Sequence, residues 1–551
     1  MRNWYKSGEP WIWATAGAVA LSLVAVYAVV WLTAARGLTH FWPKPIAEVT
    51  LQERDGSTSR LIGEIREKEE VSLIRLREQG YKIDSKNLFT DRYLVKLGNK
   101  DLTGIDFKWF PAPMLGEFTY PKDMVAIERR EWGNFYGRLK AVKETGNVVA
   151  EGPVAWAEME KRLVRSNDLF RQALRIAKSD IGKINYALER VRLRERKLEM
   201  TNELTEAAKA NFVKERGARE AEYAVLQQRL ELIRRDIERD SVSIETSDGQ
   251  LVDIPLAKIA DMYMPNAMSV WQKMGFYVHK FYEFVSDDPR EANTEGGIFP
   301  AIFGTVMMVL LMSVMVTPLG IMAAIYMREY AKPGPVIRTI RISVNNLAGV
   351  PSIVYGVFGL GFFVYVLGGS IDELFFAAAL PAPTFGSPGL LWASLTLALL
   401  TLPVVIVATE EGLSRVPRTI REGSLALGAT KAETLGRTVL PMASPAMMTG
   451  LILAVARAAG EVAPLMLVGV VKLAPSLPLD GSFPFLHLER KFMHLGFHIY
   501  DVGFQSPNVE AARPLVYATA LLLVIIIVVL NLAAIRLRNR MREKLRGLEG
   551  V

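Results

Sequence analysis

The chain has 551 residues, of which 50% are hydrophobic and 23% are charged, and its formal net charge is +8. It contains no cysteine, which excludes disulfide bonds, thiolate metal sites and a cysteine nucleophile. Much of the basic excess lies in short loops and behind the last apolar run. We therefore interpret it as a membrane anchor and expect no nucleic-acid partner.

The apolar residues cluster in six runs, each long enough to cross about 30 Å of hydrocarbon as a helix. The runs cover residues 11–34, 299–327, 347–367, 390–408, 446–471 and 515–535. The sequence therefore predicts an α-helical integral membrane protein with six transmembrane helices.

The first run, within residues 1–37, is predicted to be a retained transmembrane helix with its N-terminus in the cytoplasm. A cleaved signal peptide is the alternative, because Ala34 and Ala35 offer small residues for cleavage. The run is longer than the apolar part of a signal peptide usually is, and this length favours the anchor.

Residues 38–295 have the charged, turn-rich composition of a water-soluble domain. Turn signals at Asp55-Gly56, Gly98-Asn99 and Trp132-Gly133 separate short apolar strands, which predicts a small antiparallel β unit. A further hairpin around Asp248-Gly249 suggests that the helical residues before it are an insertion in this unit.

Residues 155–240 are strongly charged, lack proline and carry apolar residues at heptad spacing. As one rod they would extend about 130 Å at about 1.5 Å per residue. We instead predict a long coiled-coil-like hairpin of two antiparallel helices that turns between Met200 and Gly217.

Residues 268–285 form an amphipathic, aromatic segment that includes Trp271 and Tyr282. We interpret this segment as an elbow helix that lies on the membrane surface. A core helix of the soluble domain would show the same periodicity and is the alternative.

The basic loop residues give one consistent orientation to all six runs under the positive-inside rule. If the domain at residues 38–295 is outside, the loops after the second and fourth runs and the basic tail at residues 541–551 are inside. The sequence therefore predicts that both termini are cytoplasmic.

The loop at residues 410–442 is predicted to form two short helices joined by a bend at the cytoplasmic face. Gly428 would end the first helix in a left-handed conformation, and Thr430 with Glu433 forms a capping box that starts the second. Pro441 is predicted to end that second helix. Such a bent peg can sit in a groove of another protein, and an ordinary interfacial loop is the alternative.

Two charges lie in the fifth run, where a cation at mid-membrane costs about 2.5–3.5 kcal/mol. Glu461 follows Arg457 by four residues, so we expect an ion pair on one helical face. A guanidinium stays protonated and matches an oxyanion through parallel N–H donors, so Arg457 is a candidate for an anion path. A pair that only locks two helices together is the alternative.

Ser352 is a second candidate for the same path. It follows residues 349–351, where glycine and proline interrupt the third apolar run, and a broken helix at membrane depth is tolerated where it lines a cavity. A simple helix start with Ser352 in its first turn is the alternative.

The loop at residues 410–442 resembles the signature of ABC importer permeases, E-A-A-x3-G-x9-I-x-L-P. Every spacing is intact: Glu422, Gly428, Leu440 and Pro441 match, and Gly423, Ser424 and Thr438 replace the other marked residues. Three further stretches resemble the permease subunit of bacterial phosphate ABC importers, the PstA type. They are GGIFPAIFGT from Gly296, NNLAGVPSIVYGVFGLGFF from Asn345 and AVARAAGEVAPL from Ala454.

The resemblance implies an ABC importer permease core at residues 296–540. It does not account for the large α+β periplasmic domain at residues 38–295, which a standard permease does not need. It implies a subunit that translocates inorganic phosphate across the bacterial inner membrane. The implied partners are a homologous second permease, two ATPase subunits and a periplasmic phosphate-binding protein. The chain has no G-x-x-x-x-G-K-[ST] loop, H-E-x-x-H motif or paired carboxylates, so we expect no catalytic residue, metal or cofactor in it. ATP and magnesium are expected on the partner ATPase.

The resemblance also assigns roles to residues. Arg457 and Glu461 match a pair that is regarded as important for transport in the family. The residues expected to couple the permease to the ATPase are Glu422, Gly423, Ser424, Leu425, Leu427, Gly428, Thr430, Glu433 and Pro441.

Two other functions remain open from the sequence. An importer of another oxyanion, such as sulfate or molybdate, would use the same mechanism. An envelope signalling or scaffold protein would act through the periplasmic domain, but it would need only one or two plain spans as an anchor.

Overall fold

The computed structural model describes residues 8–53, 57–78, 80, 88–290, 293–506 and 509–549. They form two units. The helical unit contains the described residues of Met1–His40, Ile298–Ser506 and Ala512–Val551, and the sheet unit contains those of Phe41–Gly297 and Pro507–Ala511. The predicted turn at Asp55-Gly56 lies outside the described residues.

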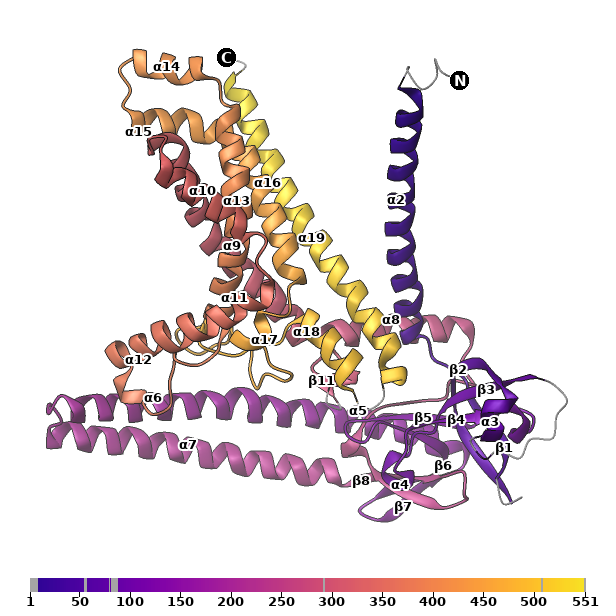
Figure 1. Cartoon of the computed structure of the whole chain (residues 1–551). Coiled ribbons are helices and arrows are strands. Elements are labelled where there is room, and N and C mark those ends of the chain that lie inside the picture. The colour runs from indigo at the N-terminus through magenta and orange to yellow at the C-terminus, as the bar shows by residue number, and fades with distance from the viewer. Residues whose placement is uncertain are drawn as a thin grey trace. The chain divides into compact units, whose positions relative to one another are not determined.

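Six helices of the described residues are long and apolar enough to cross a membrane, which confirms the predicted number. They cover Glu9–Phe41, Phe299–Tyr330, Ser352–Phe375, Leu390–Arg415, Lys431–Gly460 and Ala512–Arg540. Their α-helical parts in Figure 1 are α2 (Glu9–Leu38), α9 (Phe299–Ile325), α11 (Ser352–Phe358), α12 (Gly369–Phe375), α13 (Leu390–Arg415), α15 (Lys431–Thr434), α16 (Leu440–Gly460) and α19 (Val509–Glu549). The shorter helices of this unit include α10 (Pro335–Leu347), α14 (Arg418–Ala426), α17 (Leu465–Val468) and α18 (Leu495–Tyr500).

Helix α13 forms the centre of the helical unit, because α9 and α16 both pack along it. Glycines permit this close approach. A Cβ added to Gly320 of α9 would lie 2.6 Å from Val405, and one added to Gly450 of α16 would lie 2.6 Å from Ala408. A larger residue at either position would therefore push the helices apart.

The predicted start of the third span and the predicted end of the fifth span are wrong. The third span begins at Ser352, so residues 348–351 separate α10 from α11 and precede the span instead of interrupting it. The fifth span ends at Gly460, because Glu461 is extended and Pro464 follows it. Hydropathy extended the prediction to residue 471 because the next apolar residues form the separate short helix α17.

Pro441 does not end a helix, contrary to the prediction. Helix α15 continues through a π-helical turn at Leu435–Val439 into α16, which contains Pro441. Proline removes one N–H donor from the helical ladder. In the wider turn directly before it, the N–H of Leu440 bonds to the carbonyl oxygen of Leu435, and the helix accommodates the proline.

The sheet unit contains two antiparallel sheets of three or more strands among its described residues. The first has the order β1 (Ile46–Gln52), β2 (Thr58–Ser72), β3 (Phe89–Lys96) and β4 (Phe107–Pro111). The second has the order β10 (Ile259–Tyr263), β5 (Met124–Arg129), β6 (Asn134–Glu144), β8 (Asp240–Glu245) and β9 (Leu251–Pro255), with β7 (Asn147–Glu151) also paired to β6. Trp132 and Gly133 take left-handed φ values in the predicted turn between β5 and β6.

Two long helical arms are inserted between β7 and β8. The first arm consists of α5 (Pro153–Arg175), a π-helical turn and α6 (Ile181–Met200), and the second arm is α7 (Glu206–Glu238). The chain reverses at residues 201–205, inside the predicted interval, and α6 and α7 lie side by side (Figure 1). Strand β8 pairs with β6 after this excursion, so strands from both sides of the insertion close one sheet.

Helix α8 (Val270–Ser286) has two different faces. One face packs within the sheet unit, where the rings of Phe276 and Tyr263 lie 4.4 Å apart and Phe284 is buried. The opposite face is apolar and exposed, and it carries Trp271, Met274, Val278 and Tyr282. A core contact and an open apolar face therefore coexist on one helix.

Candidate functional site

The bent segment, residues 418–434, has the predicted succession of helix, break and helix. Helix α14 ends before Gly428, whose φ of +87° disfavours any residue with a Cβ. The predicted capping box is present. Glu433 N donates to Thr430 Oγ1 at 3.3 Å, and Thr430 N donates to Glu433 Oε2 at 2.9 Å.

The predicted coupling residues lie on this bent segment, except Pro441, which lies inside α16. Glu422 and Gly423 are exposed on α14, and Leu427 at the bend is 92% exposed. The hydroxyl oxygen of Ser424 lies 2.9 Å from that of Thr434, and this bond joins α14 to α15. The bent segment therefore presents an apolar side chain at a bend that internal bonds hold in shape.

The residues that fasten the bent segment to the other helices were missed by the sequence analysis. Arg421 donates to the carbonyl oxygens of Leu413 at 2.6 Å and Val416 at 3.1 Å, and to Glu329 Oε1 at 2.9 Å. Lys431 donates to the carbonyl oxygen of Glu329. The signal in the sequence was Glu329, an acidic residue within the basic loop that follows the second apolar run.

Arg457 lies in the last turn of α16, and Glu461 lies just beyond the helix end. The prediction that both share a helical face is wrong, because Glu461 has an extended backbone with ψ of 132°. The side chains still form an ion pair, with 3.5 Å between Arg457 Nε and Glu461 Oε1. They are 34% and 21% exposed, so the pair is only partly shielded.

Helix α11 packs against the chain that follows this ion pair. A Cβ added to Gly356 would lie 2.7 Å from the Cα of Pro464, so the two segments are in close contact. Ser352 is the first residue of α11, one turn before Gly356. Within the described part of the chain, no hydrogen bond or ion pair joins Ser352 to Arg457 or Glu461.

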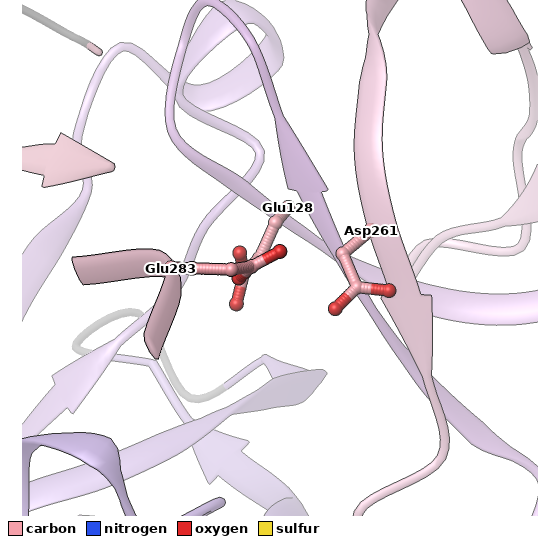
Figure 2. A group of neighbouring side chains, drawn as sticks. All are labelled: Glu128, Asp261 and Glu283. Atoms are coloured by element: carbon pink, nitrogen blue, oxygen red, sulfur yellow. The ribbon is translucent and has the colours of Figure 1, made fainter. Parts of the chain in front are cut away.

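An acidic cluster lies in the sheet unit. Glu128 on β5, Asp261 on β10 and Glu283 on α8 each offer a carboxylate oxygen within 4.8 Å of the others (Figure 2). The Lys280 ammonium lies 3.0 Å from Glu128 Oε2, 2.7 Å from Asp261 Oδ2 and 2.9 Å from Glu283 Oε2. One internal cation therefore bridges the three carboxylates, and the cluster fastens α8 to the second sheet.

The charged forms of Glu128 and Lys280 stabilise one another. Burial opposes the charged form of Glu128, but Lys280 and Arg290 outweigh it, so the pKa of Glu128 lies below its ordinary value. Burial also opposes the ammonium form of Lys280, but the three carboxylates raise the pKa of Lys280 well above its ordinary value. Glu128 and Lys280 are therefore both charged at neutral pH.

Comparison with known proteins places similarity in the C-terminal part of the chain. The family model described as "Binding-protein-dependent transport system inner membrane component" matches residues 316–546. The chain is 36% identical over 250 residues to phosphate transport system permease protein PstA 1 of Mycobacterium tuberculosis, which covers 44% of this chain and 71% of that protein. It is 32% identical over 238 residues to the probable phosphate transport system permease protein PstA of Methanocaldococcus jannaschii, covering 42% and 73%. It is 30% identical over 271 residues to the probable ABC transporter permease protein YqgI of Bacillus subtilis, covering 48% and 85%.

Proposed function

Since the chain belongs to the binding-protein-dependent transport permeases, and among them to the PstA type, we propose that it conducts inorganic phosphate across the bacterial inner membrane. It is an ABC importer permease and therefore a transport subunit. ATP, with magnesium, is hydrolysed on a partner subunit in this proposal.

The observation that carries the proposal is which N–H groups of the Arg457 guanidinium have a partner. Among the described residues, its Nε pairs with Glu461 at 3.5 Å, and its two terminal amino groups make no hydrogen bond. These free N–H donors on a permanently charged group suit a tetrahedral oxyanion. Arg457 donates to the anion when the path is open, and Glu461 holds Arg457 when the path is empty.

The bent segment supplies the coupling in this proposal. Two ATPase subunits receive the exposed apolar bend at Leu427, and the attachments of the segment carry its displacement into the helical unit. A homologous second permease completes the conduit, and a periplasmic phosphate-binding protein delivers the substrate. The names of the relatives, which include phosphate transport system permeases, support this assembly.

The proposed orientation follows from the basic loops. Both termini are cytoplasmic, and the sheet unit with its coiled-coil-like arms is periplasmic. The bent segment, with Arg418, Arg421 and Lys431, then lies in the cytoplasm, where the ATPase subunits are.

Competition between oxyanions tests the substrate. The assembly is reconstituted in proteoliposomes with its partners, and uptake of labelled phosphate is measured with excess unlabelled phosphate, sulfate or molybdate. We expect only unlabelled phosphate to suppress uptake. Equal suppression by sulfate or molybdate would show that the path does not select phosphate.

Replacing Gly428 by valine is expected to release the ATPase subunits from the complex. The left-handed backbone at Gly428 costs a β-branched residue about 1–3 kcal/mol, so the bend would change shape. The measurement is the amount of ATPase that co-purifies with the permease. Gly423→Ala is the matched control, because Gly423 lies on α14 with open space for a Cβ and the family signature has alanine there. Retention of the ATPase by Gly428→Val at the control level would contradict the proposed docking.

The exposed face of α8 is proposed to lie on the membrane surface, and a spin label at Met274→Cys is expected to report lipid. The chain has no cysteine, so one label can be placed without background. Power-saturation measurements should show the Met274 label more accessible to oxygen than to a water-soluble nickel complex. A label at Val225→Cys on the exposed side of α7 is the control and should show the reverse. Nickel access at Met274, or protection from both reagents, would reject lipid contact.

A further inference from the structure

The bent segment is attached to the end of α9 through Glu329. Glu329 lies in the π-helical turn Tyr326–Tyr330, which directly continues α9. Its carboxylate accepts a hydrogen bond from Arg421, before the bend, and its carbonyl oxygen accepts one from Lys431, after the bend. One residue next to α9 therefore holds both halves of the bent segment.

This attachment is partly shielded from water and has several bonds. The side chains of Arg421 and Glu329 are only 19% and 12% exposed, so solvent screens their attraction less than that of a surface pair. Arg421 also satisfies carbonyl groups at the end of α13. Lys431 lies over the ring of Tyr330, 4.8 Å from its centroid.

An apolar layer lies beside these bonds. It joins the ends of α9 and α13 to the beginning of the fifth span through Ile325, Leu413, Val416, Leu435 and Val439. A close-packed layer of this kind has low compressibility and transmits displacement. The end of α9 is therefore joined to the bent segment by polar contacts, and to the chain just before and just after that segment by apolar contacts.

The other end of α9 has its own specific attachment. Thr305 Oγ1 accepts a hydrogen bond from the backbone N–H of Leu495 at 2.9 Å. Gly304 packs so closely on the chain that an added Cβ would lie 2.1 Å from the carbonyl oxygen of Met493. Helix α9 therefore connects the bent segment at one end with residues 493–495 at the other.

We propose that Glu329 is a positioning residue that makes α9 move together with the bent segment. A displacement of the segment then reaches residues 493–495, at the opposite end of α9. The inference rests on the proposed function, in which the segment receives force from the ATPase subunits. Without the Glu329 carboxylate, ATP hydrolysis continues but drives less import.

The first test measures phosphate imported per ATP hydrolysed in proteoliposomes that contain the whole assembly. We expect this ratio to fall about tenfold or more in Glu329→Ala. Glu329→Gln keeps an acceptor oxygen for Arg421 and should fall less. Glu410→Ala is the matched control and should stay within about twofold, because Glu410 pairs with Arg341 and, among the residues that the structure describes, with none of the bent segment. An unchanged ratio in Glu329→Ala, a parallel loss of both activities or loss of the ATPase would overturn the proposal.

The second test does not depend on the substrate. Spin labels at Met322→Cys on α9 and Thr419→Cys on α14 report the distance between these helices in the otherwise cysteine-free chain. In the labelled chain that keeps Glu329, we expect the same distance distribution with and without trapped nucleotide. Once Glu329→Ala is added, we expect trapped nucleotide to shift that distribution. A shift in the labelled chain that keeps Glu329 would overturn the proposal. The labelled assembly that keeps Glu329 could also show an invariant distance and yet import no phosphate. That result would support the inference and reject only the proposed substrate.

Discussion

Replacing Arg457 by alanine is expected to abolish phosphate import while the assembly still forms and hydrolyses ATP. The guanidinium is the permanent cation that ends the fifth span, and its terminal N–H groups are free among the described residues. Loss of such a contact corresponds to about 2–5 kcal/mol, so uptake should fall by about 30-fold or more. The measurement is the initial rate of labelled phosphate uptake, with ATP hydrolysis recorded in the same vesicles.

A matched control separates this effect from a general loss of positive charge. Arg415 ends α13 and is 76% exposed, and within the described ranges its one ion pair is a long contact of 3.9 Å with Glu411. Arg415→Ala should therefore take up phosphate at nearly the wild-type rate. Uptake by Arg457→Ala at the same rate as the control would remove Arg457 from the anion path.

Replacing Lys280 by methionine is expected to open the contact between α8 and the second sheet. The substitution keeps a long, unbranched side chain but removes its ammonium. Glu128, Asp261 and Glu283 then lie close together without their shared cation. Removal of one partner from a buried charge network costs about 3–5 kcal/mol, and the Lys280 side chain is only 11% exposed. Amide hydrogen exchange in β5 and β10 of the full chain should therefore accelerate by about 100-fold or more.

An exposed lysine provides the control for this prediction. Lys209 pairs with Glu206 on α7, and their side chains are 48% and 89% exposed. Lys209→Met should leave exchange in the sheet unchanged, because an exposed pair contributes little.

A chelator of divalent metals should also have no effect on amide exchange in the unmodified chain. Faster exchange in the presence of the chelator would show that the acidic cluster holds a metal ion.

The number of spans and the shape of the bent segment could be predicted because both depend on residues close together in the chain. A run of about 20 apolar residues partitions into a bilayer on composition alone. The left-handed Gly428 and the bonds between Thr430 and Glu433 depend on backbone preferences and neighbours three residues apart. No distant contact is needed for either feature.

The ends of the spans were less predictable, because hydropathy measures composition and not backbone direction. The apolar residues of α17 extend the fifth run in the sequence, although Glu461 has already turned the chain out of the helix. Pro441 shows the opposite error, because a wider π-helical turn lets the helix continue where a proline signal predicted its end.

Only the tertiary structure decided which charged residues meet. Arg421 lies 92 residues from Glu329, and Lys280 lies 152 residues from Glu128. No periodicity or spacing in the sequence relates such residues, because packing of α9 against α13 and of α8 against the second sheet sets their separation. The sequence alone determined which segments enter the membrane and where the chain bends, while long-range packing determined how the bent segment and α8 are held.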